Sequence, residues 1–137
     1  MAGLKKILLV VFACAFVASC SDCRKDGYVI FINNVDCMNC QAGNMFKLKT
    51  PEFNSQLRAN DVCVVFPYMR QQMQEKTIKD YGLEGLNVQF DDEAFEHYKN
   101  ISGTSFSSIV KLKKGKAVDV VELRNLNVYD FTFRIGN

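Results

Sequence analysis

Two cysteines, Cys37 and Cys40, stand with two residues between them and are the side chains best placed for chemistry. They follow an apolar run, residues 29–32 (VIFI). In some proteins two thiols at this spacing form a redox dithiol, and in others they supply half of a metal site or a structural disulfide. The spacing also arises by coincidence. Because the spacing does not choose among these roles, the compartment of the protein and the surrounding elements are needed to interpret it.

The N-terminal segment has the order of features that export requires. Two lysines precede residues 7–16, a continuous apolar run that is too short to cross a bilayer about 30 Å thick as a stable helix. Small residues then precede Cys20, which resembles the lipobox of bacterial lipoproteins, where a cysteine receives lipid after cleavage. We expect residues 1–19 to be a signal peptide and Cys20 to carry a lipid anchor. An ordinary signal peptide cleaved nearby is the alternative.

The mature chain from residue 20 onward has the size of one domain. The chain holds 17 basic residues, and removing the two lysines of the signal peptide leaves 15, which match its 15 acidic residues. This balance gives no indication of a nucleic-acid partner, and we expect none. We interpret residues 20–27 as a short tether and residues 28–137 as the domain. Outside the cytoplasm its cysteines can oxidise.

Hydrophobic patterning predicts strands alternating with helices. The expected strands are residues 28–33, 61–69 and 86–90, and a hairpin covers 106–123; the expected helices are 39–50, 70–83 and 91–102. Residues 51–60 form either a second short helix or a continuation of the first after a break, and the tail from 127 is either an edge strand or a docked extension. This order is typical of an α/β fold with a central mixed sheet, helices on both faces and a C-terminal antiparallel hairpin. We expect residues 61–69 to be central in the sheet.

The pattern resembles the thioredoxin-like superfamily, specifically its redoxin or TlpA-type branch of membrane-tethered thiol–disulfide oxidoreductases. Three stretches carry the resemblance, within about residues 28–124: residues 28–40 (YVIFINNVDCMNC), 61–69 (DVCVVFPYM) and 87–118, which contain an acidic turn, Gly-Thr and a Lys-Gly-Lys hairpin turn. The resemblance implies a thioredoxin-like fold.

The resemblance also implies roles for particular residues. Cys37 corresponds to the nucleophilic cysteine and Cys40 to the resolving one. Their disulfide is then the redox group, with no further cofactor and no metal, and the partners are protein thiols and disulfides in the cell envelope. From the lipobox-like signal we expect the protein to face the periplasm or the cell surface from a bacterial membrane, with the outer membrane as one candidate location.

The sequence departs from this family at two places. The family has a cis-proline opposite its cysteine pair, and Ser105, Phe106 and Ser107 occupy that region here. The family motif also has a tryptophan before the first cysteine and Gly-Pro between the two, whereas this chain has Asp36 before Cys37 and Met-Asn inside the motif.

A cysteine between a strand and a helix is chemically activated, because the N–H groups of the first turn and the helix dipole stabilise its thiolate. Cys40 then lies on the same face of the turn as Cys37, within reach of a disulfide. Asp36 opposes a second negative charge beside it and should raise the pKa of Cys37. Because destabilising the thiolate makes the disulfide harder to reduce, we expect a reductant rather than an oxidant.

The remaining cysteines and the single histidine have simpler interpretations. Cys63 stands among apolar residues and is expected to be a buried core side chain. Cys23 is expected to be exposed and able to pair between molecules. We expect His97, on a polar helix, to lie at the surface.

Three functions remain open from the sequence. The first is a lipid-anchored thiol–disulfide oxidoreductase that reduces protein disulfides outside the cytoplasm. The second is a binding or structural lipoprotein that keeps a thioredoxin-like scaffold without turnover, which Asp36 and the missing proline favour. The third, ranked last, is a copper-handling module that uses Cys37, Cys40 and His97, since thiolate and imidazole suit copper.

Overall fold

The apolar run before the cysteine pair forms the central strand of the fold. In the computed structural model, which describes residues 23–34 and 38–134, this strand is β1 (Gly27–Phe31). Its residues from Tyr28 to Phe31 are all buried. Such a run, without polar alternation, is what a strand covered on both faces requires.

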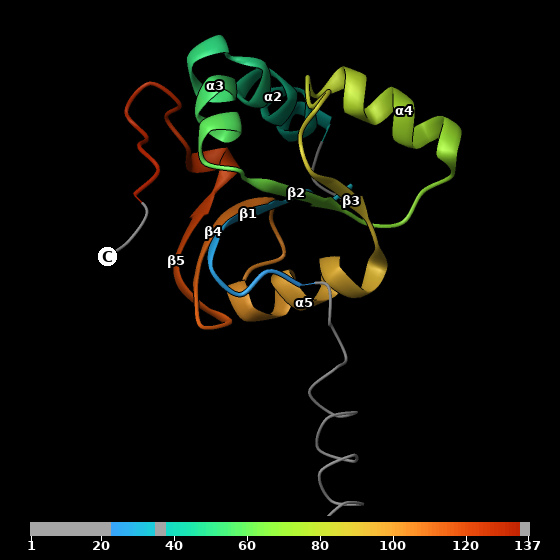
Figure 1. Cartoon of the computed structure of the whole chain (residues 1–137). Helices are drawn as coiled ribbons and strands as arrows, with labels where there is room; N and C mark the ends of the chain where they lie inside the picture. Colours follow the sequence, from blue (N-terminus) through green and yellow to red (C-terminus); the bar gives the residue numbers. More distant parts are fainter. Residues whose placement is uncertain (1–22, 35–37, 135–137) are drawn as a thin grey trace, which may run out of the picture.

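The described residues form a five-stranded mixed sheet and four α-helices (Figure 1). The strand order is β3-β2-β1-β4-β5; β1, β2 and β3 are parallel, and β4 and β5 pair antiparallel to their neighbours. The elements after β1 are α2 (Met38–Lys49), α3 (Pro51–Ala59), β2 (Cys63–Phe66), α4 (Gln71–Asp80), β3 (Val88–Phe90), α5 (Asp92–Ser102), β4 (Ser108–Lys113), β5 (Lys116–Glu122) and the 3-10 turn η2 (Leu123–Asn125). The predicted order of strands and helices is confirmed.

Local sequence explains where two of the helices begin and end. Residues that precede proline avoid the helical region, and Thr50, before Pro51, has φ −55° and ψ 122°. Pro51 therefore begins a separate helix, α3. Of the two predicted alternatives for residues 51–60, the second short helix is the one the structure shows. Asp91 caps α5 by accepting hydrogen bonds from the N–H groups of Glu93 and Ala94, and Gly103 ends the helix with a left-handed φ of 75°.

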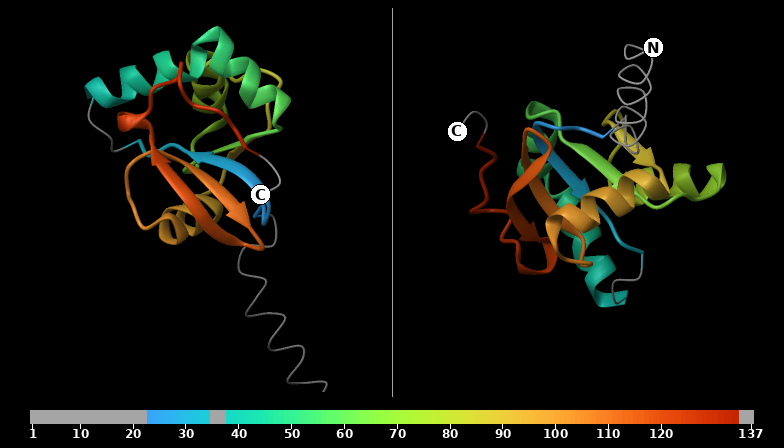
Figure 2. Two further views of the ribbon diagram at one scale, coloured as in Figure 1. Left: turned by 90° about the vertical axis from the view of Figure 1, so that its left-hand side faces the viewer. Right: turned by 90° about the horizontal axis from the view of Figure 1, so that it is seen from below.

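The two faces of the sheet carry separate hydrophobic cores. Tyr28 and Ile30 of β1 point into the core under α2 and α3, whereas Val29 and Phe31 point into the core under α5. Figures 1 and 2 show α2, α3 and α4 on one face and α5 on the other. The predicted arrangement of helices on both faces is confirmed.

The C-terminal tail is a docked extension, because residues 127–134 form no strand. Val128 and Phe133 are buried, and the Phe133 ring meets the Tyr28 ring edge-on at 4.9 Å between centroids. The Tyr28 hydroxyl donates to the Arg134 carbonyl at 2.8 Å and accepts from the Arg134 N–H at 2.7 Å. The tail therefore covers the sheet on the same face as α2 and α3.

Cys63 is a buried thiol in β2, as predicted, with 2% of its surface exposed. The prediction that its strand is the central one is wrong in detail: β2 lies between β1 and β3, and β1 holds the central position because the hairpin adds two strands on its other side. Burial raises the pKa of the Cys63 thiol to about 11, against a lowering by Arg24 and a small raising by Asp61.

We expect iodoacetamide at pH 8 to modify Cys63 in the native protein at least about a hundredfold more slowly than in denaturant, since burial blocks access and suppresses the thiolate. Mass spectrometry of the alkylated peptide measures both rates. Equal rates would mean that β2 is not an interior strand.

The raised pKa of Cys63 also makes the stability of the fold depend on pH. The contribution of the buried neutral thiol to the free energy of unfolding is complete below the ordinary pKa of 9.0 and is lost as the pH rises through about 11.

Candidate active site

The candidate site lies where β1 ends and α2 begins. β1 ends at Phe31 and α2 starts at Met38, so Cys40 is in the first turn of the helix. Cys40 is half-buried and disulfide-bonded. Cys37 and Asp36, the predicted nucleophile and the residue predicted to raise its pKa, lie outside the described residues.

The hairpin brings a second segment to the same edge of the sheet. Phe31, the last residue of β1, pairs with Ser108, the first of β4, and Ser108 pairs with Glu122, the last of β5. The loop of residues 103–107 and the turn η2 therefore adjoin the C-terminal end of β1. The loop that the family resemblance predicts opposite the cysteine motif falls in this range.

Asn33 attaches this loop to the segment that leads toward the cysteines. Its backbone N–H donates to Ser107 Oγ at 2.8 Å, and its side-chain Nδ2 donates to the Ser105 carbonyl at 2.7 Å. Asn33 and Ser107 are both buried. The structure thus places Ser105 and Ser107 beside the end of β1. Sequence reasoning missed Asn33, although a polar residue that directly follows a fully apolar strand is a signal for such a role.

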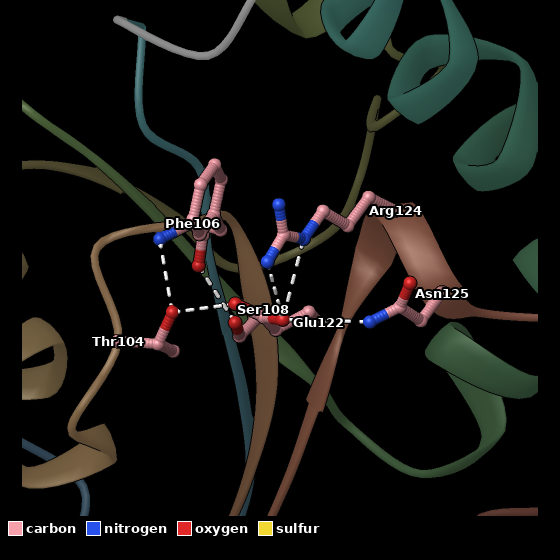
Figure 3. Close-up of polar contacts among 6 residues, drawn as sticks. All are labelled: Thr104, Phe106, Ser108, Glu122, Arg124 and Asn125. Carbon is pink, nitrogen blue, oxygen red and sulfur yellow. Dashed lines mark hydrogen bonds and ion pairs between the residues drawn. The ribbon is translucent and has the colours of Figure 1, made fainter.

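Hydrogen bonds hold the proline-free loop on both sides of Phe106 (Figure 3). The Thr104 hydroxyl donates to Glu122 Oε2 at 2.6 Å and accepts from the Phe106 N–H at 3.2 Å. The Ser108 hydroxyl donates to the Phe106 carbonyl at 2.6 Å. The side chains of Thr104, Ser108 and Glu122 therefore fix the loop between α5 and β4.

Arg124 completes a cluster that sequence reasoning missed. Its guanidinium carbon lies 3.6 Å from the centroid of the Phe106 ring, a cation–π contact. Its Nε and Nη2 donate to Glu122 Oε1 at 3.3 and 3.2 Å. The hydrogen bond from Thr104 lowers the pKa of the Glu122 carboxyl; burial opposes this, and Arg124 adds to it. The cluster could not be predicted from the sequence, because it depends on the register of the hairpin, which pairs Ser108 with Glu122.

Lys47 joins the helix of the cysteine motif to this cluster. Lys47 Nζ, in the last turn of α2, donates to the Leu123 carbonyl of η2 at 2.5 Å. Partial burial lowers the pKa of Lys47. The helix that carries Cys40 and the turn that carries Arg124 are therefore in direct contact.

Two apolar side chains at this edge are open to solvent. Met38, between the two cysteines, is 86% exposed, and Phe106 is 38% exposed. Side chains of this kind near a reactive group offer contact area to a polypeptide. Phe106, predicted from the resemblance as part of the facing loop, is thus accessible from outside.

His97 and Cys23 lie elsewhere. His97 is half-buried on α5, and its ring meets the Tyr98 ring at 5.2 Å between centroids; α5 covers the face of the sheet opposite to α2, which carries Cys40. In the described part of the chain no group of three His, Cys, Asp or Glu side chains could hold a metal ion. Cys23 was expected to be exposed, but it is half-buried against the core under α5 and is disulfide-bonded.

No family model matches the chain, and neither a curated protein nor a solved structure matches it. The features of this chain that bear on a function are therefore the cysteine pair and the residues around it.

Proposed function

We propose that this protein is a lipid-anchored thiol–disulfide oxidoreductase that reduces protein disulfides outside the cytoplasm, with Cys37 and Cys40 as its redox pair. One observation carries the proposal: Cys40 is disulfide-bonded and half-buried in the first turn of α2, directly after the central strand of a mixed sheet. A helix N-terminus stabilises a thiolate, and partial exposure lets a substrate reach the pair.

A thioredoxin-like arrangement is part of the proposal. Three parallel strands, an antiparallel hairpin and helices on both faces support it. The loop that contains Ser105 and Ser107 supports it as well, because it lies against the residues that lead to the cysteine pair.

The proposed reaction transfers two electrons to the substrate. The Cys37 thiolate attacks a substrate disulfide, whose S–S bond breaks and releases one substrate thiolate, which takes up a proton. The Cys40 thiolate then attacks the Cys37 sulfur of the mixed disulfide, forms the Cys37–Cys40 disulfide and releases the second substrate thiol. An external thiol reductant must return the pair to its dithiol form. Asp36 raises the pKa of Cys37 in this account and makes the pair more reducing.

The membrane anchor rests on the N-terminal sequence alone. Residues 1–19 and Cys20 lie outside the described residues. From residue 23 onward, no described helix is long and apolar enough to cross a membrane. A lipid on Cys20 would hold the domain close to the membrane surface, where envelope proteins with disulfides are its partners.

Insulin reduction tests the proposal. With dithiothreitol as the thiol reductant, we expect the wild-type protein to accelerate precipitation of the insulin B chain well above the rate with dithiothreitol alone. The variant with Cys37→Ala and Cys40→Ala should show only the background rate. Cys63→Ala is the matched control and should keep the wild-type rate, because that thiol is buried.

The alternative is a binding or structural protein whose cysteine pair does not turn over. The hydrogen-bonded loop favours it, because Thr104, Glu122 and Ser108 fix the proline-free segment around Phe106, in the region where the family has a cis-proline. A wild-type protein that reduces insulin no faster than the double variant would support this alternative and would rule out the proposed activity.

A further inference from the structure

Arg124 presents an unused guanidinium edge beside the candidate site. Its side chain is 45% exposed. A guanidinium has five N–H donors, and Glu122 occupies the edge formed by Nε and Nη2. Among the described residues nothing accepts a hydrogen bond from the other terminal nitrogen, Nη1, and Figure 3 shows it pointing away from Glu122. The edge formed by Nη1 and Nη2 is therefore open to a second carboxylate.

The guanidinium is held in place before any ligand arrives. Its face lies on the Phe106 ring, and Glu122 orients its plane. Glu122 is in turn fixed by the Thr104 hydroxyl at 2.6 Å. An arginine fixed in this way loses less side-chain entropy on binding than a freely moving one, and its planar fork matches a carboxylate bidentately.

The position of Arg124 relates it to the cysteine pair. It follows Leu123, whose carbonyl accepts the hydrogen bond from Lys47 of α2. Its stacking partner Phe106 lies between Ser105 and Ser107, which both bond to Asn33 at the end of β1. The loop of Phe106 therefore lies at the end of β1, and the Lys47 contact places η2 at the C-terminal end of α2. A substrate segment that lies over the end of β1 and extends along α2 toward η2 would pass this guanidinium.

We propose that Arg124 binds a carboxylate of the substrate protein and makes the reaction selective for disulfides flanked by Asp or Glu. The proposal rests on the proposed function, for which it names the substrate class. The selectivity acts on binding: the acidic side chain forms a bidentate pair with Nη1 and Nη2, which raises the occupancy of the complex in which the neighbouring disulfide is reduced. Arg124 takes no part in the transfer of electrons.

The test compares two disulfide-bonded peptides that are identical except for Glu or Gln next to one cysteine. With the full-length protein at low salt, we expect kcat/KM to be about threefold to fivefold higher for the Glu peptide, the range of one well-oriented surface ion pair, with the difference mainly in KM. In about 0.5 M NaCl, where the Debye length is roughly 4 Å, the preference should shrink toward one.

Arg124→Gln should reduce both peptides equally well, at the rate of the Gln peptide. Lys113→Gln is the matched control: it removes an exposed cation at the far end of β4, next to the hairpin turn, and should keep the preference. A preference that persists in Arg124→Gln, or is absent in the wild type, would overturn the proposal.

A second readout separates this proposal from the proposed function. The side-chain Nε–H signal of Arg124 in an NMR spectrum should shift on addition of a reduced, alkylated Glu peptide and not of the Gln peptide. If insulin and both peptides remain unreduced but this shift occurs, the reductase function fails and the carboxylate site stands. If the peptides are reduced without a shift or a preference, the site fails and the reductase function stands.

Discussion

Cys40→Ala is expected to accumulate covalent mixed disulfides with insulin chains, whereas Cys37→Ala is expected to form few or none. Attack by Cys37 creates the mixed disulfide, and without Cys40 no neighbouring thiol resolves it. Non-reducing gel electrophoresis and mass spectrometry of the adduct measure the trapped fraction, which should rise from nearly none in the wild type to most of the protein at excess insulin.

The position of the adduct provides the check on this expectation. It should lie on Cys37, and the double variant with Cys40→Ala and Cys63→Ala should trap as much as Cys40→Ala alone, because Cys63 is only 2% exposed. Trapping through Cys40 in Cys37→Ala, at a level equal to that of Cys40→Ala, would show that the two roles are assigned the wrong way round.

Phe66→Ala is expected to lower the free energy of unfolding by about 3–5 kcal/mol, the usual cost of removing a buried phenylalanine ring. Phe66 ends β2 with no exposed surface, stacks on Phe90 at 5.1 Å between centroids and meets Tyr81 edge-on at 5.4 Å. Its ring thus packs β2 against Phe90 of β3 and against Tyr81, the residue that follows α4. Removing the ring would leave a large cavity between them. Urea unfolding followed by circular dichroism measures the loss.

Phe46→Ala on α2 removes the same ring from a site that is 64% exposed and serves as the control. It should change the free energy of unfolding by no more than about 0.5 kcal/mol. Similar losses in the two variants would contradict the assignment of Phe66 to the core between the sheet and the helices.

The sequence was sufficient to predict most of the fold, because burial imposes a visible pattern on it. The unbroken apolar run of β1 indicated a strand covered on both faces, and the apolar residues around Cys63 indicated its burial. Pro51 marked the end of α2 through its effect on Thr50. Each of these signals acts through neighbouring residues in the chain.

The contacts around the candidate site could not be predicted in the same way, because they depend on register. A register shift between Lys111 and Leu112 in the β4–β5 pairing decides which residues face each other at the open end of the hairpin, where Ser108 pairs with Glu122. Only the paired strands bring Thr104 to Glu122, and only then does Arg124 lie on Phe106. The structure places Ser105 and Ser107 beside the end of β1. The roles that the resemblance implies for Ser105, Phe106 and Ser107, like those of Asp36 and Cys37, stay predictions.

The redox equilibrium of the Cys37–Cys40 pair decides whether this protein is a thiol–disulfide reductase. The protein would be equilibrated with dithiothreitol buffers of graded potential, quenched in acid, alkylated, and analysed by mass spectrometry for the peptide that contains both cysteines. We predict a reversible two-electron transition with a midpoint between about −230 and −300 mV, in the range of reducing protein dithiols. A disulfide that survives below about −300 mV, as structural disulfides do, or a pair that never forms a disulfide, would contradict the account.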